Sequence, residues 1–188
     1  MTKRALLTGI TGQDGAYLAQ LLLSKGYEVS GVIRRSSHRG VEDHRLRWLG
    51  VANDVQLLDG DLSDLSSLLR IVQEVKPDEV YNLAAQSFVA SSWRQPILTA
   101  NITAVAVAKV LEALRLGAPG ARFYQASSSE MYGLIQEPMQ SERRPSIRAR
   151  LTPSPSSTAI GSRSITARAS ACTPPRAFSS IMRARCAA

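Results

Sequence analysis

The sequence has few cysteines and histidines, the side chains that most often hold zinc and other transition metals. Its 188 residues include two cysteines, Cys172 and Cys186, and two histidines, His38 and His44. The cysteines do not have the spacing of metal ligands, and each histidine is isolated and expected at a surface or loop position. We therefore expect no metal site.

Long apolar runs and targeting patterns are also missing. No run approaches the roughly 20 apolar residues that a membrane-spanning helix needs. The mean hydropathy is −0.08, and the N-terminal residues have one early Lys-Arg pair without a signal-peptide pattern. These observations predict a cytoplasmic protein with no membrane partner.

Lysine and acidic side chains are absent from residue 143 onward, where the chain has nine arginines. Residues 1–142 hold 14 basic and 15 acidic side chains, so the net charge of +8 comes from the tail. Neither a helical nor a strand period persists there. We predict one domain over 1–142 and a disordered, basic, low-complexity tail over 143–188. A nucleic-acid-binding arm would also fit this charge, but we expect no nucleic-acid partner because the charge is not spread over the fold.

A glycine turn near the N-terminus stands between an apolar run and a helical pattern. Residues 5–7 predict a short buried strand, glycines follow at three-residue spacing, and 16–25 have the apolar period of a helix. This order is typical of the phosphate-binding opening of a dinucleotide fold, where backbone approaches a pyrophosphate at a helix N-terminus. The predicted cofactor-binding residues of this turn are Gly9, Thr11, Gly12, Gln13, Asp14 and Gly15.

The second predicted strand, 28–33, ends in two arginines and no carboxylate. In a dinucleotide fold this place meets the adenosine ribose, where a carboxylate suits a 2′-hydroxyl and arginine suits a 2′-phosphate. Arg34, Arg35 and Ser36 therefore favour NADP over NAD as the cofactor. A solvated basic loop is the alternative interpretation of these residues.

Strands and helices continue to alternate along the chain. Further strands are predicted at 55–58, 79–83 and 122–126, with helices at 65–75 and 100–116 between them. Five strands in this alternation predict an α/β fold with a parallel, doubly wound, Rossmann-like sheet that is incomplete at its C-terminal side.

Two packing expectations follow from the same patterns. The segment 38–53, between the second and third strands, is expected to be helical or irregular, with Leu46, Trp48 and Leu49 anchoring it to the core. The long helix at 100–116 would bury one face, made of Ala104, Val105, Ala108, Leu111 and Ala113.

The ends of the third and fourth strands supply the remaining predicted cofactor contacts. An aspartate after the third strand can bind an adenine amino group, and Ser63 or Asp64 would then cap the next helix. Small residues after the fourth strand would let a nicotinamide ribose lie against backbone. The predicted residues are Asp61, Leu62, Leu83, Ala84, Ala85, Gln86 and Ser87.

Taken in order, these motifs closely resemble the GDP-mannose 4,6-dehydratase family of the extended short-chain dehydrogenase/reductase superfamily. The resemblance covers about three quarters of the chain, and the Gln-Asp pair in the glycine turn and the double arginine favour this family over the sugar epimerases. The segments that carry it are 8–15, 34–37, 59–62, 82–87 and 125–133.

The resemblance implies an NADP that is reduced and reoxidised in each turnover, with GDP-mannose as the substrate and a homo-oligomer for the full-length enzyme. Such enzymes take a hydride from sugar carbon 4, remove the proton at carbon 5 with a glutamate, eliminate water from carbon 6 and return the hydride there. Glu130 matches this glutamate, and Ser128 stands where the family usually has a threonine that binds the reacting sugar oxygen. A helix cap with a first-turn acid is the alternative for these two residues.

One part of the family pattern is missing. The superfamily uses a Tyr-x-x-x-Lys pair on the next helix, but no tyrosine follows Tyr132 and no lysine follows Lys109. We therefore expect the 188-residue chain to be inactive. Another nucleotide-sugar dehydratase or epimerase, or a noncatalytic NADP-binding protein with a basic interaction tail, are the alternatives.

The tail itself suggests why the pair is missing. Back-translated in a shifted frame, 145–162 permits Phe-Tyr-Pro, Arg-Ser-Pro-Tyr-Ala-Val-Ala-Lys and then Leu-Tyr-Gly-His-Trp-Ile. This string includes a Tyr-x-x-x-Lys pair and matches what the family has at this point. The hypothesis is a truncated chain with a single-base deletion near codons 143–145.

Overall fold

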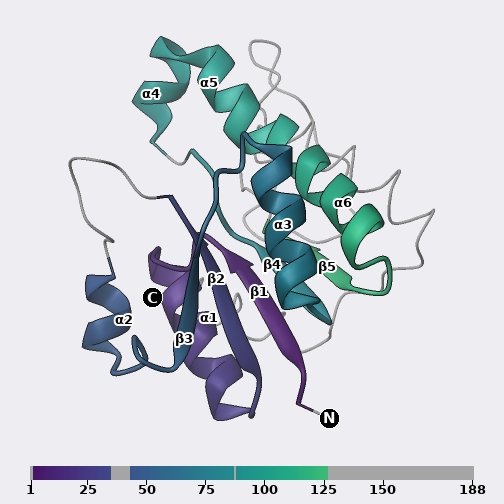
Figure 1. Ribbon diagram of the computed structural model, residues 1–188. Coiled ribbons are helices and arrows are strands. Elements are labelled where there is room, and N and C mark those ends of the chain that lie inside the picture. The colour runs from purple at the N-terminus through teal and green to yellow at the C-terminus, as the bar shows by residue number, and fades with distance from the viewer. Residues whose placement is uncertain (1, 35–42, 87, 127–188) are drawn as a thin grey trace, which may run out of the picture.

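The computed structural model describes residues 2–34, 43–86 and 88–126 (Figure 1). Within them, one sheet of parallel strands has the order β3-β2-β1-β4-β5. The order reverses at β1, which pairs with β2 on one side and β4 on the other. The strands are β1 Arg4–Thr8, β2 Glu28–Ile33, β3 Val55–Asp59, β4 Glu79–Asn82 and β5 Arg122–Gln125. This is the predicted doubly wound, Rossmann-like arrangement, with its switch point between β1 and β4.

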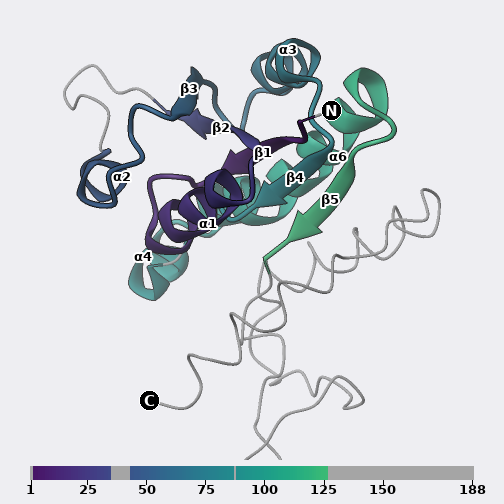
Figure 2. The ribbon, with the colours of Figure 1, turned by 90° about the horizontal axis from the view of Figure 1, so that it is seen from below.

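Helices cover both faces of the sheet, as the end-on view in Figure 2 shows. Helix α1 lies on one face, and α3 and α6 lie together on the other. Helices α4 and α5 stand beyond the carboxyl ends of the strands, at the top of Figure 1. The helices are α1 Gln13–Ser24, α2 His44–Trp48, α3 Leu65–Val75, α4 Val89–Arg94, α5 Pro96–Ala100, the π-helix η1 Asn101–Val105, and α6 Ala106–Gly117.

Strand alternation divides the core into two layers. Because successive side chains of a strand point to opposite faces, Ala5 and Leu7 pack under α1 whereas Leu6 packs under α3 and α6. The three side chains are at most 3% exposed. A short apolar run therefore fills both layers at once, which is typical of a strand buried in a parallel sheet.

Two elements have the predicted bounds. The strand expected at 28–33 and the helix expected at 65–75 are found as β2 and α3 without any shift. Of the two residues expected to cap α3, Asp64 does so, and its carboxylate accepts hydrogen bonds from the backbone N–H groups of Ser66 (3.0 Å) and Ser67 (3.1 Å). Helix α1 begins three residues earlier than expected, inside the glycine turn.

The expected role of Trp48 as a core anchor is wrong. Its side chain is 77% exposed, whereas Leu46 is fully buried and Leu49 packs against the same cluster. Residues two apart on a helix do not share a face, but residues three apart do. The short helix α2 can therefore bury Leu46 and Leu49 together only by turning Trp48 outward.

The expected buried face of the long helix is only partly right. Ala113 is buried and Leu111 packs, partly buried, against the cluster under α3 and α6, whereas Val105 and Ala108 are exposed. The buried residues of α6 are Ala106, Val107, Val110, Ala113 and Leu114. The π-helix η1 directly precedes α6, and a π-turn adds a residue to the helical repeat. A uniform 3.6-residue period carried through this segment therefore predicts a face that is displaced from the observed one.

One helical segment could span a membrane by its length and composition, which the sequence analysis did not single out. It covers Pro96–Gly117, with 22 residues and a mean hydropathy of 1.6. One third of the apolar window is buried. Because its second half, α6, packs against α3 and the sheet, we interpret the segment as one of the helices that cover the sheet.

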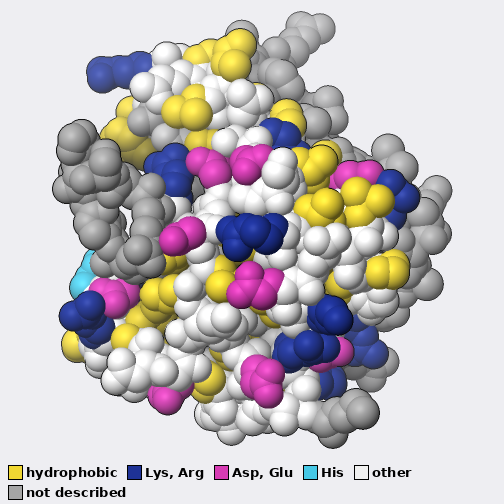
Figure 3. Space-filling model, in the orientation of Figure 1, with side chains coloured by type: hydrophobic (Ala, Val, Ile, Leu, Met, Phe, Trp, Pro, Cys, Tyr) yellow, Lys and Arg dark blue, Asp and Glu magenta, His cyan; other side chains and the backbone are white. Residues whose placement is uncertain are grey.

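The surface shown in Figure 3 has basic and acidic side chains interspersed, without a large patch of one sign. Apolar side chains are exposed on and beside α4 and α5, beyond the carboxyl ends of the strands. They include Phe88, Trp93 and Ile97, which are 66%, 67% and 75% exposed.

Candidate nucleotide-binding site

The glycine turn connects β1 to α1 at the switch point of the sheet. Gly9 has a φ of +70°, which side chains of L-residues rarely allow. The N–H of Gly12 donates to the carbonyl oxygen of Gly9 at 3.0 Å and closes the turn. A Cβ on Gly9 would lie 2.8 Å from the amide nitrogen of Ala84. Only glycine therefore allows this turn to lie directly against the exit of β4.

The other two glycines bring the start of α1 onto the turn. Gly12 is the N-cap of α1 and has no side chain that could accept a hydrogen bond from the first helical turn. A Cβ on Gly15 would lie 2.2 Å from the carbonyl oxygen of Gly9. Backbone N–H groups in a first helical turn have no partner inside the helix and carry partial positive charge. The arrangement is a cradle of the kind that binds phosphate.

Two residues that the sequence analysis missed hold the turn in place. Ile10 is fully buried, and its side chain packs onto Gly31 of β2, where a Cβ would lie 2.5 Å from Ile10 Cγ2. Arg45 of α2 donates from Nη1 to the carbonyl oxygen of Thr11 at 3.0 Å. An apolar residue between glycines could have indicated the anchor at Ile10. Nothing in the sequence indicates the contact of Arg45.

The predicted adenosine end lies where β2 and β3 end. Asp61 Oδ1 accepts hydrogen bonds from the backbone N–H of Ser63 (2.8 Å) and from its hydroxyl (2.7 Å). These bonds lower the pKa of Asp61, and the positive charge of Arg34 lowers it further. The positive charge of Arg34 and the hydrogen bonds from Ser63 therefore both favour the ionised form of Asp61. Leu62 is half-buried and packs against the cluster under α3 and α6.

The predicted nicotinamide end lies where β4 ends. The N–H of Leu83 donates to the carbonyl oxygen of Thr8 at 3.3 Å, so the segment leaves the sheet beside the glycine turn. Leu83 and Ala84 are half-buried, and Ala85 is exposed. The N–H of Gln86 donates to Thr103 Oγ1 in η1 at 3.4 Å, which ties this segment to the π-helix.

Five predicted site residues lie outside the described residues. They are Arg35, Ser36, Ser87, Ser128 and Glu130. The expectations for the tail at 143–188 lie outside them as well. Among the residues that the structure does describe, no group of three or more His, Cys, Asp or Glu side chains could hold a metal ion.

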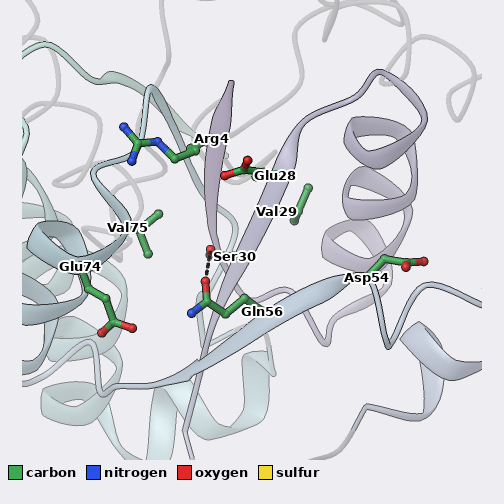
Figure 4. Close-up of a pocket in the computed structure, with 8 residues that line it drawn as sticks. All are labelled: Arg4, Glu28, Val29, Ser30, Asp54, Gln56, Glu74 and Val75. Atoms are coloured by element: carbon green, nitrogen blue, oxygen red, sulfur yellow. Dashed lines mark hydrogen bonds between the residues drawn. The ribbon is translucent and has the colours of Figure 1, made fainter. Parts of the chain in front are cut away.

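A separate hollow of about 350 Å³ lies at the amino ends of the strands, away from the candidate site (Figure 4). The residues around it come from the beginnings of β1, β2 and β3 and from the end of α3. Inside it, the Ser30 hydroxyl donates to Gln56 Oε1 at 3.3 Å. Because nucleotides bind at the carboxyl ends of parallel strands, this hollow does not belong to the candidate site. It is lined by Arg4, Glu28, Val29, Ser30, Asp54, Gln56, Glu74 and Val75.

The geometry of the switch point agrees with a comparison against known families. The family model described as GDP-mannose 4,6 dehydratase matches residues 6–152, which include the glycine turn and the ends of the strands. The chain belongs to this family. The family resemblance predicted from the ordered motifs is thereby confirmed.

Individual relatives agree with this assignment. The GDP-mannose 4,6-dehydratase of Vibrio cholerae is 53% identical over 150 residues, which cover 77% of this chain and 40% of that protein. The GDP-mannose 4,6-dehydratase of Yersinia enterocolitica is 50% identical over 148 residues, with coverage of 76% and 40%. The chain thus spans about 40% of the length of these curated relatives.

Solved structures support the fold. The UDP-glucose 4-epimerase from Brucella ovis, whose structure contains NAD, matches with a TM-score of 0.74. The match covers 90% of this chain and 49% of the epimerase at 21% sequence identity. At that identity the likeness shows a shared fold.

Proposed function

We propose that this chain is the cofactor-binding part of an NADP-dependent GDP-mannose 4,6-dehydratase. The reaction is the conversion of GDP-mannose to GDP-4-keto-6-deoxymannose by internal hydride transfer. Family membership and relatives of that name support the substrate and the reaction. The observation that best supports a dinucleotide cofactor is the contact of Gly9 with Ala84. A side chain on Gly9 would collide with the backbone of Ala84, so only backbone lines the switch point there.

The described residues offer a proposed contact for each part of a dinucleotide. The glycine turn and the first turn of α1 would bind the pyrophosphate through backbone N–H groups. Arg34 and Asp61 would bind the adenosine end, and the segment from Leu83 to Gln86 would lie along the nicotinamide ribose. When bound, the nicotinamide ring supplies the group that accepts the hydride and returns it.

The preference for NADP rests on charge at the end of β2. Arg34 is exposed there and can form charged hydrogen bonds to a 2′-phosphate. Arg35 and Ser36 follow it in the sequence and would add to this preference. The nearby carboxylate of Asp61 already accepts two hydrogen bonds from Ser63. Both bonds fall on Oδ1, and Asp61 follows β3 and not β2, so it does not occupy the place of the carboxylate that binds the 2′-hydroxyl in an NAD site.

A titration of NADPH and NADH against the 188-residue chain tests this preference. We expect NADPH to bind more tightly, and Arg34→Ala and Arg35→Ala each to weaken NADPH by about 1.5–3 kcal/mol, the range for charged hydrogen bonds. NADH binding should hardly change in these variants. Arg115→Ala is the matched control, because Arg115 lies on α6 and pairs with Glu112. Equal affinities of the wild-type chain for the two cofactors would rule out the NADP preference.

The proposed catalytic residues are Ser128 as the hydroxyl donor and Glu130 as the base at carbon 5. The tyrosine and lysine that start oxidation in this superfamily do not occur at the expected place in the sequence. We therefore propose that the 188-residue chain binds cofactor without turning over substrate. Nucleotide sequencing across codons 138–160 tests the proposed single-base deletion directly. The cytoplasmic location and the homo-oligomeric state of the full-length enzyme stay predictions.

A further inference from the structure

A row of three polar side chains crosses the sheet directly below the candidate site. Thr8, Asn82 and Gln125 are the last residues of β1, β4 and β5, and they are neighbours in the strand register. Their side chains are 2%, 1% and 7% exposed. Three neighbouring strands therefore each end in a buried polar residue.

These side chains form one chain of hydrogen bonds. Thr8 Oγ1 donates to Asn82 Oδ1, and Asn82 Nδ2 donates to Gln125 Oε1 at 2.7 Å. At each end, this series of hydrogen bonds reaches a backbone group. The N–H of Ala84 donates to Thr8 Oγ1 at 3.2 Å, and Gln125 Nε2 donates to the carbonyl oxygen of Ala126 at 2.8 Å.

Core packing alone does not account for this polar row. The row two residues earlier on the same face is fully apolar and consists of Leu6, Val80 and Phe123. Apolar side chains thus pack well on this face, and burying polar groups adds little stability even when they are paired. Unlike the apolar row, the polar row forms hydrogen bonds to the backbone of Ala84 and Ala126, just beyond the ends of the strands.

The position of the row relates it to one end of the candidate site. Ala84 is the residue against which Gly9 packs, and Thr8 directly precedes Gly9. The predicted adenosine contacts follow β2 and β3, on the other side of the switch point. A dinucleotide lies across this point. The row therefore underlies the nicotinamide half and not the adenosine half.

We propose that Thr8, Asn82 and Gln125 are positioning residues for the nicotinamide end of the cofactor. They fix the exits of β4 and β5 relative to the glycine turn, so that the backbone at Ala84 lies where the nicotinamide ribose binds. This inference rests on the proposed dinucleotide function and assigns these residues a part in it.

Binding to the full 188-residue chain tests the assignment with two probes. NADPH occupies both halves of the site, whereas adenosine 2′,5′-bisphosphate occupies only the adenosine half. Thr8→Val removes the hydroxyl but keeps the branched shape, and Thr8→Ser keeps the hydroxyl. We expect Thr8→Val to weaken NADPH by about tenfold, the scale of a lost hydrogen bond that leaves a buried partner unpaired. The bisphosphate affinity should change less than about twofold, and Thr8→Ser should restore NADPH binding.

The outcomes separate this inference from the proposed function. A wild-type chain that binds neither probe overturns the dinucleotide function and the inference with it. A wild-type chain that binds both, with both affinities lowered equally or left unchanged by Thr8→Val, overturns only the inference. If Thr8→Val does not fold, Gln125→Met at the other end of the row replaces it, and the same two affinities, for NADPH and for the bisphosphate, are compared. If neither variant folds, the row serves the fold alone and the inference is wrong.

Discussion

Gly9 and Ala84 touch through their backbones, although one follows β1 and the other follows β4. A Cβ on Gly9 would lie 2.8 Å from the Ala84 amide nitrogen and 3.0 Å from its Cα. The contact joins the two loops on either side of the switch point, where a dinucleotide fold binds its ligand. The absence of one side chain thus determines the shape of the site.

The first prediction concerns this contact. Gly9→Ala should lower the free energy of unfolding by roughly 1–2 kcal/mol for the left-handed backbone. Overpacking against Ala84 should lower it by about 1–3 kcal/mol more. Gly26→Ala is the matched control, because Gly26 has a φ of +78° but no atom within 4 Å of the added Cβ. Urea unfolding of the two variants measures the difference, and equal losses would contradict the contact.

The second prediction concerns the anchor of the glycine turn. Ile10→Ala removes a fully buried side chain and should lower the free energy of unfolding by about 2–5 kcal/mol. Ile97→Ala makes the same change at a side chain that is 75% exposed, and its effect should stay within about 0.5 kcal/mol. Urea titrations followed by circular dichroism compare the two. Similar effects would show that Ile10 does not anchor the turn.

The third prediction concerns the pH dependence of the α3 cap. Hydrogen bonds from Ser66 and Ser67 hold the pKa of Asp64 below its ordinary value of 3.8. A lowered pKa in the folded state means that the cap stabilises the protein above pH 3.8 and loses this effect as the pH falls below it.

Two variants test the cap. Asp64→Ala should lower the urea midpoint at pH 7 because it loses the cap, whereas Asp64→Asn keeps an acceptor and should lose less. Between pH 5 and about 3, the midpoint of the wild type should fall more steeply than that of Asp64→Asn, whose cap does not titrate. Parallel slopes for the two proteins would exclude a stabilising role for the Asp64 charge.

The fourth prediction concerns Glu130 in a frame-restored, extended protein. If Glu130 is the base at carbon 5, Glu130→Gln should allow oxidation at carbon 4 but lower the elimination rate by about 10²–10⁴. NADPH should then accumulate on the enzyme and be visible by its absorbance after GDP-mannose is added. Glu137→Gln, a nearby acidic residue to which no role is assigned, serves as the control. Full turnover by the Glu130→Gln variant would remove Glu130 from this role.

The elements predicted best from the sequence are those with an uninterrupted local pattern. The strand β2 is bounded by polar residues, and α3 has a regular apolar face after an Asp64 cap, so both ends of each could be located. The glycine turn was likewise found from spacing alone. Its glycines pack closely against backbone, as the pattern predicts, and the binding of cofactor there stays a prediction.

The features that could not be predicted from the sequence depend mainly on contacts between segments that are distant in the sequence. The hydrogen-bonded row of Thr8, Asn82 and Gln125 exists only because β4 pairs beside β1 in a particular register. Arg45 meets Thr11 only after α2 has packed beside α1. The π-helix η1 shifts the face of α6 without any local signal that periodicity detects, and so Val105 was expected in the core although it is 42% exposed.

The central proposal is that this family member binds NADP but does not turn over GDP-mannose, because its sequence has no Tyr-x-x-x-Lys pair after Tyr132. Its most direct test is a GDP-mannose assay, in parallel, of the purified 188-residue chain and of a protein with one base restored near codon 144 and the reading frame extended. The account predicts GDP-4-keto-6-deoxymannose from the restored protein and none from the 188-residue chain. Product from the 188-residue chain, or none from a folded, NADPH-binding restored protein, would contradict it.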